Sequence, residues 1–131
     1  MGFILVDLAR VENPAPEDLL SVNFWNWRPT LELIRSMKLI DAERMETLGM
    51  SGVATRVSEV EAREIGTHLT RDVLPALAPD ERINLDQSTT GEPDDFKVHQ
   101  GTNVHKNYGA TRPWLEKFAA FCLSCRGFEV S

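Results

Sequence analysis

Long apolar runs and clusters of basic residues are both absent from this sequence of 131 residues. The apolar stretch Phe3–Val6 ends at Asp7 and is too short for a signal peptide or a membrane span, so we expect a cytoplasmic protein without a membrane partner. Lysine and arginine form no run, and 20 acidic against 14 basic side chains give a net charge of −6. Because phosphate backbones repel such a surface, we expect no nucleic-acid partner, while a basic protein partner is permitted.

The common catalytic motifs are missing as well. The chain contains no G-x-S-x-G nucleophile elbow, no phosphate-binding P-loop and no H-E-x-x-H zinc motif. The sequence therefore predicts no catalytic residue and no cofactor, and it favours the binding of another protein over catalysis.

What the chain does contain is enough apolar material for a core. Apolar residues make up 42% and charged residues 26%, which is typical of one soluble domain over residues 1–131. The apolar periodicity predicts a mainly helical α+β fold, with three or four helices packed against a small sheet of N-terminal, middle and C-terminal strands. The expected strands are 2–8, 82–86 and 128–130, the expected helices are 16–22, 27–38, 42–48, 59–74 and 112–126, and a loop is expected over 49–57.

Residues 86–111 show no helical or strand period and are rich in Gly, Thr, Asn and Asp. We expect a long irregular loop here, and loops of this length inside a compact domain are often functional.

The two cysteines, Cys122 and Cys125, are expected in the apolar stripe of the last helix, together with Leu115 and Phe118. A redox pair is disfavoured, because reactive C-x-x-C thiols lie at a helix N-terminus and these lie at the C-terminal end. A disulfide is not expected in a reducing compartment. The alternative is a zinc site, since these thiols and two histidines offer four ligands of suitable type: His99, His105, Cys122 and Cys125.

The stretch "FWNWRP" places Trp25, Trp27 and Arg28 together, and these residue types dominate interface hot spots. One interpretation is that Trp27 begins the buried stripe with Leu31 and Ile34 while Trp25 covers the rim. The other is that a tryptophan lies on the surface and contacts a partner.

Two further clusters fall on the long loop. "GEPDD" contains Asp94 and Asp95 without the pattern of a calcium loop, and "HKNYG" contains His105, Lys106 and Tyr108. We interpret the second cluster as an anchor for a partner or for the loop itself. A metal-free enzyme that uses His105 and Tyr108 is a third hypothesis.

A strip of polar groups follows one side of the helix expected at 59–74, namely Glu61, Glu64, His68 and Asp72. Such a strip can hold a divalent metal ion, but charged residues opposite an apolar stripe are usually a solvated face.

The segments "WNWRPTLELI", "EPDD", "HKNY", "WLEKFAAFC" and "GFEV" together resemble a group of small, uncharacterised bacterial proteins of similar length. Small acidic bacterial proteins are often immunity-type binders that neutralise a toxin. By this analogy of class, the leading hypothesis is a cytoplasmic, immunity-like binding protein that contacts its partner through the long loop and the "FWNWR" stretch.

Overall fold

The computed structural model describes residues 2–91 and 108–131. Several candidate residues of the sequence analysis lie outside this part of the chain: Asp94, Asp95, His99, His105 and Lys106.

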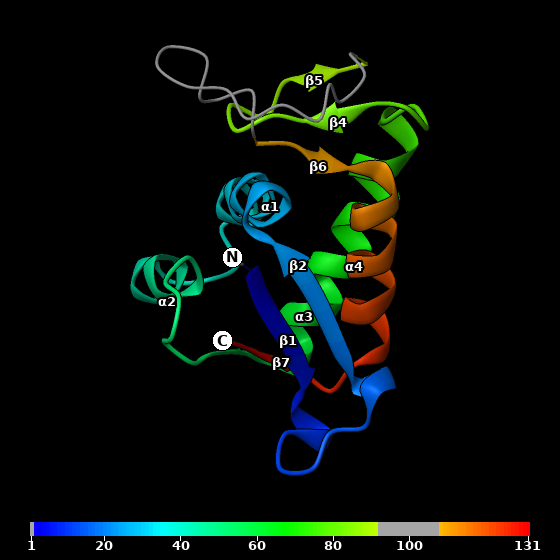
Figure 1. The fold of residues 1–131 in the computed structure, drawn as a ribbon. Helices are drawn as coiled ribbons and strands as arrows, with labels where there is room; N and C mark the ends of the chain where they lie inside the picture. Colours follow the sequence, from blue (N-terminus) through cyan, green and yellow to red (C-terminus); the bar gives the residue numbers. More distant parts are fainter. Residues whose placement is uncertain (1, 92–107) are drawn as a thin grey trace.

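The main sheet has four antiparallel strands in the order β2-β1-β7-β3. Helices α3 and α4 lie behind it in Figure 1, and α1 crosses above it. The strands are β1 (Gly2–Asp7), β2 (Leu19–Asn23), β3 (Thr55–Val57) and β7 (Phe128–Val130), and the helices are α1 (Phe24–Met37), α2 (Ala42–Leu48), α3 (Glu59–His68) and α4 (Arg112–Ser124). The predicted fold class, a mainly helical α+β domain with a sheet of N-terminal, middle and C-terminal strands, is confirmed.

The helix expected over 16–22 is wrong. Only Pro16–Asp18 forms a turn of 3-10 helix (η2), and the following residues form β2. The register places Val22 opposite Phe3 and Leu20 opposite Leu5, so that the apolar side chains of both strands face the core. This pairing outweighs the helix-start signal of a proline followed by two acids, because a strand partner is information that a local pattern does not hold.

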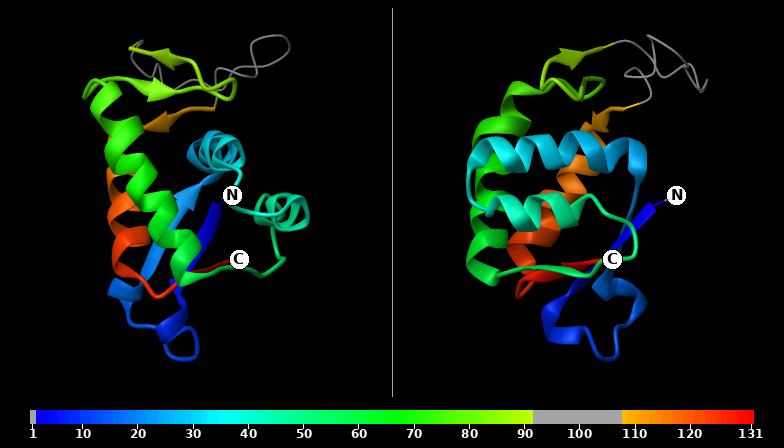
Figure 2. Two further views of the ribbon diagram at one scale, coloured as in Figure 1. Left: turned by 180° about the vertical axis from the view of Figure 1, so that it is seen from behind. Right: turned by 90° about the vertical axis from the view of Figure 1, so that its left-hand side faces the viewer.

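The loop expected over 49–57 is also partly wrong, because Thr55–Val57 forms β3, an edge strand of the main sheet that comes from the middle of the chain. The strand expected at 82–86 exists as β4 (Arg82–Ile83), but it belongs to a second, three-stranded sheet with the order β5-β4-β6. Its neighbours are β5 (Thr89–Thr90) and β6 (Ala110–Thr111), and both lie in the segment expected to be irregular. Figure 2 shows the second sheet at the far end of the molecule from the η1 turn (Leu8–Arg10).

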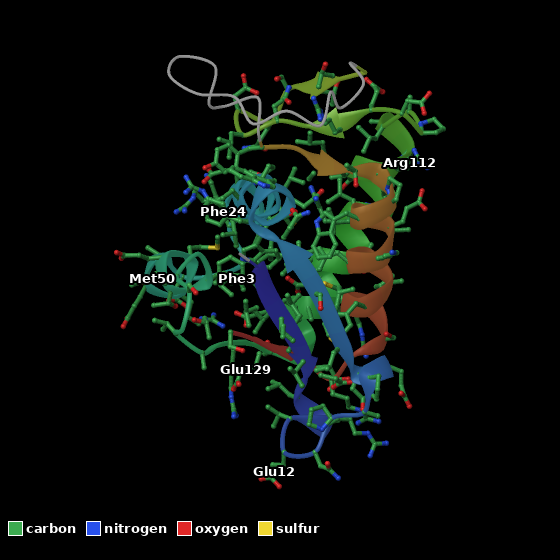
Figure 3. The ribbon with its side chains drawn as sticks, viewed as in Figure 1. Phe3, Glu12, Phe24, Met50, Arg112 and Glu129 are labelled. Carbon is green, nitrogen blue, oxygen red and sulfur yellow. The ribbon has the colours of Figure 1, made fainter. Side chains whose placement is uncertain are left out.

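The helix caps follow the sequence signals. Asp41 accepts a hydrogen bond from the Arg44 amide at the start of α2, and Ser58 with Glu61 forms the expected capping box of α3. Helix α3 continues through a π-helical turn, η3 (Leu69–Val73), and a 3-10 turn, η4 (Leu74–Ala76). Arg112 donates to the carbonyls of Leu74 and Leu77, which fixes the start of α4 against this turn (Figure 3).

Helix α1 begins earlier than the expected Trp27. Asn23 caps it, with its side-chain oxygen accepting from the Asn26 amide at 2.8 Å, and Pro29 therefore lies in the second turn. Proline has no N–H to give to the carbonyl of Trp25, which would normally cost helix stability. That carbonyl instead accepts a hydrogen bond from the Gly109 amide at 3.0 Å. The helix tolerates Pro29 because a distant segment supplies the missing donor.

The core is dense in aromatic rings. Phe118 contacts three of them, with centroid distances of 5.5 Å to Trp114, 5.8 Å to Trp27 and 6.0 Å to Phe128. Each buried indole N–H donates, that of Trp27 to the Leu48 carbonyl at 2.9 Å and that of Trp114 to the Thr30 hydroxyl at 2.8 Å. Each buried indole therefore keeps its polar group satisfied within the core.

Within residues 2–91 and 108–131, none of the helices is long and apolar enough to cross a membrane.

Candidate functional site

The start of α1 meets Tyr108 at the surface, and together they form what we call the aromatic surface: Phe24, Trp25, Arg28 and Tyr108. The ring of Tyr108 lies edge-on to Trp25, with centroids 5.0 Å apart, and to Phe24 at 5.7 Å. Trp25 keeps 39% of its area exposed, and Tyr108 is half-buried. The indole of Trp25 therefore presents a large apolar area to solvent while it stays in contact with the Tyr108 ring.

Backbone hydrogen bonds hold the aromatic surface in place. The Gly109 amide donates to the Trp25 carbonyl, and the Thr111 amide donates to the Asn26 side-chain oxygen at 3.0 Å. The amide group of Asn26 also donates to the capping oxygen of Asn23 at 3.0 Å. The chain on both sides of the Trp25–Tyr108 contact is thus tied together, so the rings are arranged before any partner arrives.

Arg28 supplies a cation to the aromatic surface. Its guanidinium carbon lies 5.6 Å from the ring centroids of both Phe24 and Tyr108, a distance at which a cation is attracted to the ring faces. The side chain is exposed, and among the described residues it has no carboxylate partner.

Arg82 on β4 lies directly beside this surface. A Cβ atom added to Gly109 would come within 2.7 Å of the Arg82 Cδ, so the arginine stem lies against the Gly109 backbone. The Arg82 Nε is buried and has no hydrogen-bond acceptor in the part of the chain that the structure describes. Glycine at position 109 allows this close approach of β4 to the chain that carries Tyr108.

The candidate binding residues of the sequence analysis fall into two groups. Trp25, Arg28 and Tyr108 come together at one surface, as described above. Trp27 is fully buried and continues into the core stripe with Leu31 and Ile34, so it contacts no partner in this conformation. The expectation that Trp27 is buried with Leu31 and Ile34 is therefore confirmed, while Trp25 lies at the surface, as the second interpretation requires of one tryptophan.

Cys122 and Cys125 are packing residues of the core, with exposed fractions of 1% and 3%, and neither forms a disulfide. Burial raises the pKa of both thiols. The neighbouring Cys125 adds to this effect at Cys122, and the carboxylates of Asp7 and Glu59 add to it at Cys125. Without a bound metal ion, both side chains are therefore neutral thiols near pH 7.

The zinc hypothesis remains a prediction, because both of its histidines lie outside the described residues. Within the described ranges, no group of three or more His, Cys, Asp or Glu side chains is arranged to hold a metal ion. Elemental analysis of protein purified without chelator tests the hypothesis.

The polar strip of α3 is divided between different partners. Glu61 turns toward α2, where the Arg44 guanidinium donates to both of its carboxylate oxygens at 2.7 Å and 2.6 Å. His68 and Asp72 instead contact each other at 3.2 Å. Glu64 and His68 line a shallow groove next to Met37 at the end of α1, together with Ser36, Leu39, Arg63, Thr67 and Arg71. The strip is therefore not one metal site.

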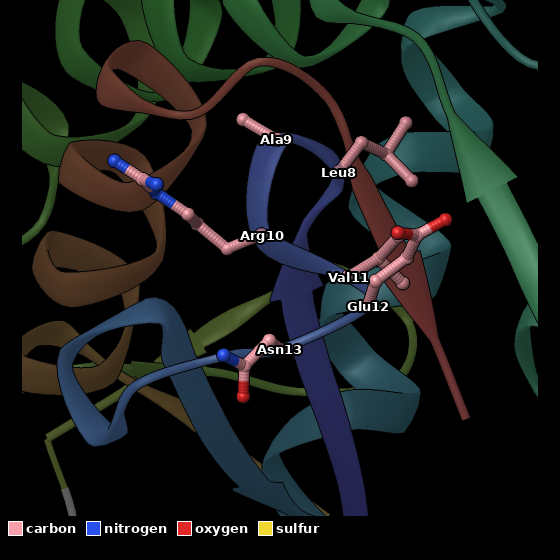
Figure 4. Close-up of a pocket in the computed structure, with 6 residues that line it drawn as sticks. All are labelled: Leu8, Ala9, Arg10, Val11, Glu12 and Asn13. Atoms are coloured by element: carbon pink, nitrogen blue, oxygen red, sulfur yellow. The ribbon is translucent and has the colours of Figure 1, made fainter.

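A second hollow lies at the end of the molecule opposite the second sheet (Figure 2). It is lined by one continuous segment, residues 8–13 (Figure 4). The charged side chains of Arg10 and Glu12 point to different sides of it. No set of functional groups converges there, so we regard it as the inside of a turn.

Three residues that shape the aromatic surface were missed by sequence reasoning: Asn26, Arg82 and Gly109. One signal for them was present. A proline in the second turn of a helix leaves the carbonyl four residues earlier without its donor, and that donor has to come from elsewhere in the chain.

Comparisons with protein-family models, with curated proteins and with solved structures found no match.

Proposed function

We propose that this chain is a non-catalytic binding protein that contacts another protein through the aromatic surface, and that it acts as an immunity-type neutraliser of a bacterial toxin. The observation that carries the proposal is the exposed indole of Trp25, held edge-on against Tyr108 by backbone hydrogen bonds.

The composition and the geometry both suit an interface. Trp, Tyr and Arg are the residue types enriched at binding hot spots, and all three occur in the aromatic surface. Rings that are already fixed lose little conformational freedom on binding, so more of the interaction energy contributes to affinity. A solvent-exposed indole contributes less to folding stability than a buried one. The exposure of Trp25 therefore favours a role in recognition over a role in stability.

The immunity-type part of the proposal rests on the resemblance to small bacterial proteins and on the acidic composition. Within this proposal the protein works in the cytoplasm, where a toxin would otherwise reach its target. The analogy is one of class and gives no partner identity.

Affinity capture from a lysate of the source organism tests the binding function. Tagged wild-type protein is compared with Trp25→Ala and with Val60→Ala, a control whose side chain is 68% exposed on α3. We expect a stoichiometric partner that the wild type and Val60→Ala retain and Trp25→Ala loses. Recovery of no stoichiometric partner under several growth conditions, or equal recovery with all three baits, contradicts the proposal.

Co-expression tests the toxin part separately. The partner, expressed alone, should arrest growth, and wild-type protein should restore growth while Trp25→Ala should not. A partner that is harmless when expressed alone leaves a binding protein but removes the immunity-type function.

A further inference from the structure

We propose that the aromatic surface recognises an acidic segment of its partner, in which a carboxylate lies next to an aromatic or aliphatic side chain. This inference rests on the proposed binding function and specifies the chemistry of the partner.

The cations of this surface differ from most other arginines of the described residues. Six arginines of the described residues lie in ion pairs with a neighbouring carboxylate: Arg35, Arg44, Arg56, Arg63, Arg71 and Arg112. Arg28 and Arg82 have no such partner within those residues, which is true also of Arg10 and Arg126, although the chain carries six more acidic than basic side chains. The guanidinium of Arg28 therefore lies at the rings without a carboxylate partner among the described residues, and the stem of Arg82 lies against Gly109, next to Tyr108.

Arg28 and Arg82 both lie near the hydrogen bond between Gly109 and Trp25. Arg82 lies against Gly109, and the Gly109 amide is bonded to the carbonyl of Trp25, one helical turn before Arg28. The buried Arg82 Nε has no acceptor among the described residues, and such a donor normally costs free energy. An anion bound at this edge would accept hydrogen bonds from the remaining guanidinium N–H groups of Arg82.

The ring contacts of Arg28 favour a carboxylate. The guanidinium of Arg28 is held near the rings of Phe24 and Tyr108, and its N–H edge has no carboxylate partner among the described residues. That edge matches the two oxygens of a carboxylate, which it can bind with two parallel hydrogen bonds. The exposed face of Trp25 lies beside it and accepts an apolar neighbour of the carboxylate.

A nucleic acid fits this surface less well, although rings and arginines also occur at nucleic-acid sites. A strand presents one phosphate after another, and beyond these two cations it would meet a molecule with a net charge of −6. A short acidic segment needs only a local cation. The net charge of the chain, which permits a basic partner, is therefore a poor guide to the chemistry at this surface.

The local charge can be measured on the free protein by quenching of tryptophan fluorescence. Trp27 and Trp114 are buried, so Trp25 is the described indole that a quencher reaches. With each constant divided by that for N-acetyltryptophanamide, we expect iodide to quench about twofold more effectively than caesium. Trp25→Phe should remove most of the quenching, and Arg28→Gln should remove the preference for iodide while Arg63→Gln keeps it. A preference for caesium overturns the inference.

Binding of labelled peptides tests the recognition itself. The probes are a peptide of alternating Glu and Phe, the same peptide with Gln or Lys in place of Glu, and an oligothymidylate. We expect the Glu peptide to bind about tenfold more tightly than the Gln peptide, and Arg28→Gln to remove this difference while Arg63→Gln preserves it. Equal affinities for all peptides, or tighter binding of the Lys peptide or the oligonucleotide, overturn the inference.

The two proposals can fail separately. A captured partner that depends on Trp25 but not on Arg28 keeps the binding function and removes the acidic segment. Absence of any stoichiometric partner removes the binding function itself, whatever the quenching shows.

Discussion

Two regions of the molecule both contain aromatic rings and lie in opposite environments. One is the aromatic surface. The other, which we call the cysteine end, lies at the C-terminal end of α4 and contains Phe121, Cys122, Cys125 and Phe128. At the cysteine end the chain turns back at Gly127 and places β7 against α4, so that Phe128 packs on Phe118 and Phe121. At the aromatic surface no described strand folds back over Trp25, which stays exposed.

The difference comes from geometry that a residue count does not contain. Successive helical residues are rotated by about 100°, so Trp25 and Trp27 point to nearly opposite sides of α1. Once Trp27 enters the core, Trp25 has to face outward. Cys122 and Cys125 are both buried, the first on α4 and the second in the extended residue that follows the helix end at Ser124. The comparison teaches that sulfur and rings mark a core or an interface only after the path of the chain is known.

The largest effect that separates the two regions is expected from one substitution made in each. Phe118→Ala should lower the free energy of unfolding by about 3–5 kcal/mol, because it removes a buried ring from contacts with Trp27, Trp114 and Phe128. Phe24→Ala, at the half-buried edge of the aromatic surface, should cost about half as much. Urea unfolding followed by circular dichroism measures both. Equal losses would show that the aromatic surface is a second part of the core.

A smaller effect is expected from Cys122→Ser, which places a hydroxyl among apolar groups and should cost about 1–3 kcal/mol. Ser124→Ala, one helical turn away from Phe121 and exposed, is the matched control and should change stability little. Urea unfolding of the two variants and the wild type measures the difference.

Thiol labelling checks the same region in the intact protein. Both thiols are buried with raised pKa values, so a disulfide reagent should react with them only after unfolding in denaturant. Rapid labelling of the native protein contradicts the packing role. Labelling that a chelator accelerates would instead support the zinc hypothesis.

Much of the cysteine end was predictable from the sequence, because its signals are local. The spacing of Leu115, Phe118 and Cys122 gives one stripe of a helix, as expected. The helix ends at Ser124, two residues earlier than expected, so that Cys125 is buried from an extended conformation and Gly127, with a φ of +88°, lies in the turn that follows. The strand Phe128–Val130 beside β1 was expected for the same reason, since apolar and polar residues alternate in the sequence, and the apolar ones are buried in the structure.

The aromatic surface and the strand β3 were less predictable, because contacts with distant parts of the chain determine them. Thr55–Val57 becomes a strand through pairing with β7, more than seventy residues later in the chain. The hydrogen bond from the Gly109 amide to the Trp25 carbonyl holds the neighbouring Tyr108 next to Trp25. The stem of Arg82 packs against Gly109, where a side chain would leave no room for it. Local propensity contains none of these contacts, although the position of Pro29 in α1 required that one of them exist.

An ion pair near the cysteine end gives a pH-dependent contrast. Arg44 and the amide of Ser58 donate hydrogen bonds to Glu61 and lower the pKa of its carboxyl from 4.5 to about 2. A lowered pKa in the folded state adds stability above pH 4.5, and this stability is lost as the pH falls toward 2. Glu61→Gln should therefore cost about 1–2 kcal/mol at pH 7, and the cost should vanish near pH 2.

Glu64→Gln is the control for this prediction, because Glu64 is exposed on the same helix and has no ion-pair partner among the described residues. Unfolding of both variants across the acidic range measures the difference. An equal cost of the two substitutions at pH 7 would show that the bonds from Arg44 and Ser58 add no net stability.

The smallest effect on stability is expected where the effect on binding is largest. Trp25→Ala should lower the free energy of unfolding by about 1 kcal/mol, because the indole is partly exposed and its ring contacts are two edge-on ones, with Tyr108 and Phe24. Urea unfolding followed by circular dichroism, which does not depend on tryptophan emission, measures it. A loss as large as that of Phe118→Ala would show that Trp25 is needed for the fold, and a lost partner would then report unfolding instead of a lost contact. A small loss together with complete loss of the partner is the result that separates recognition from folding at this residue.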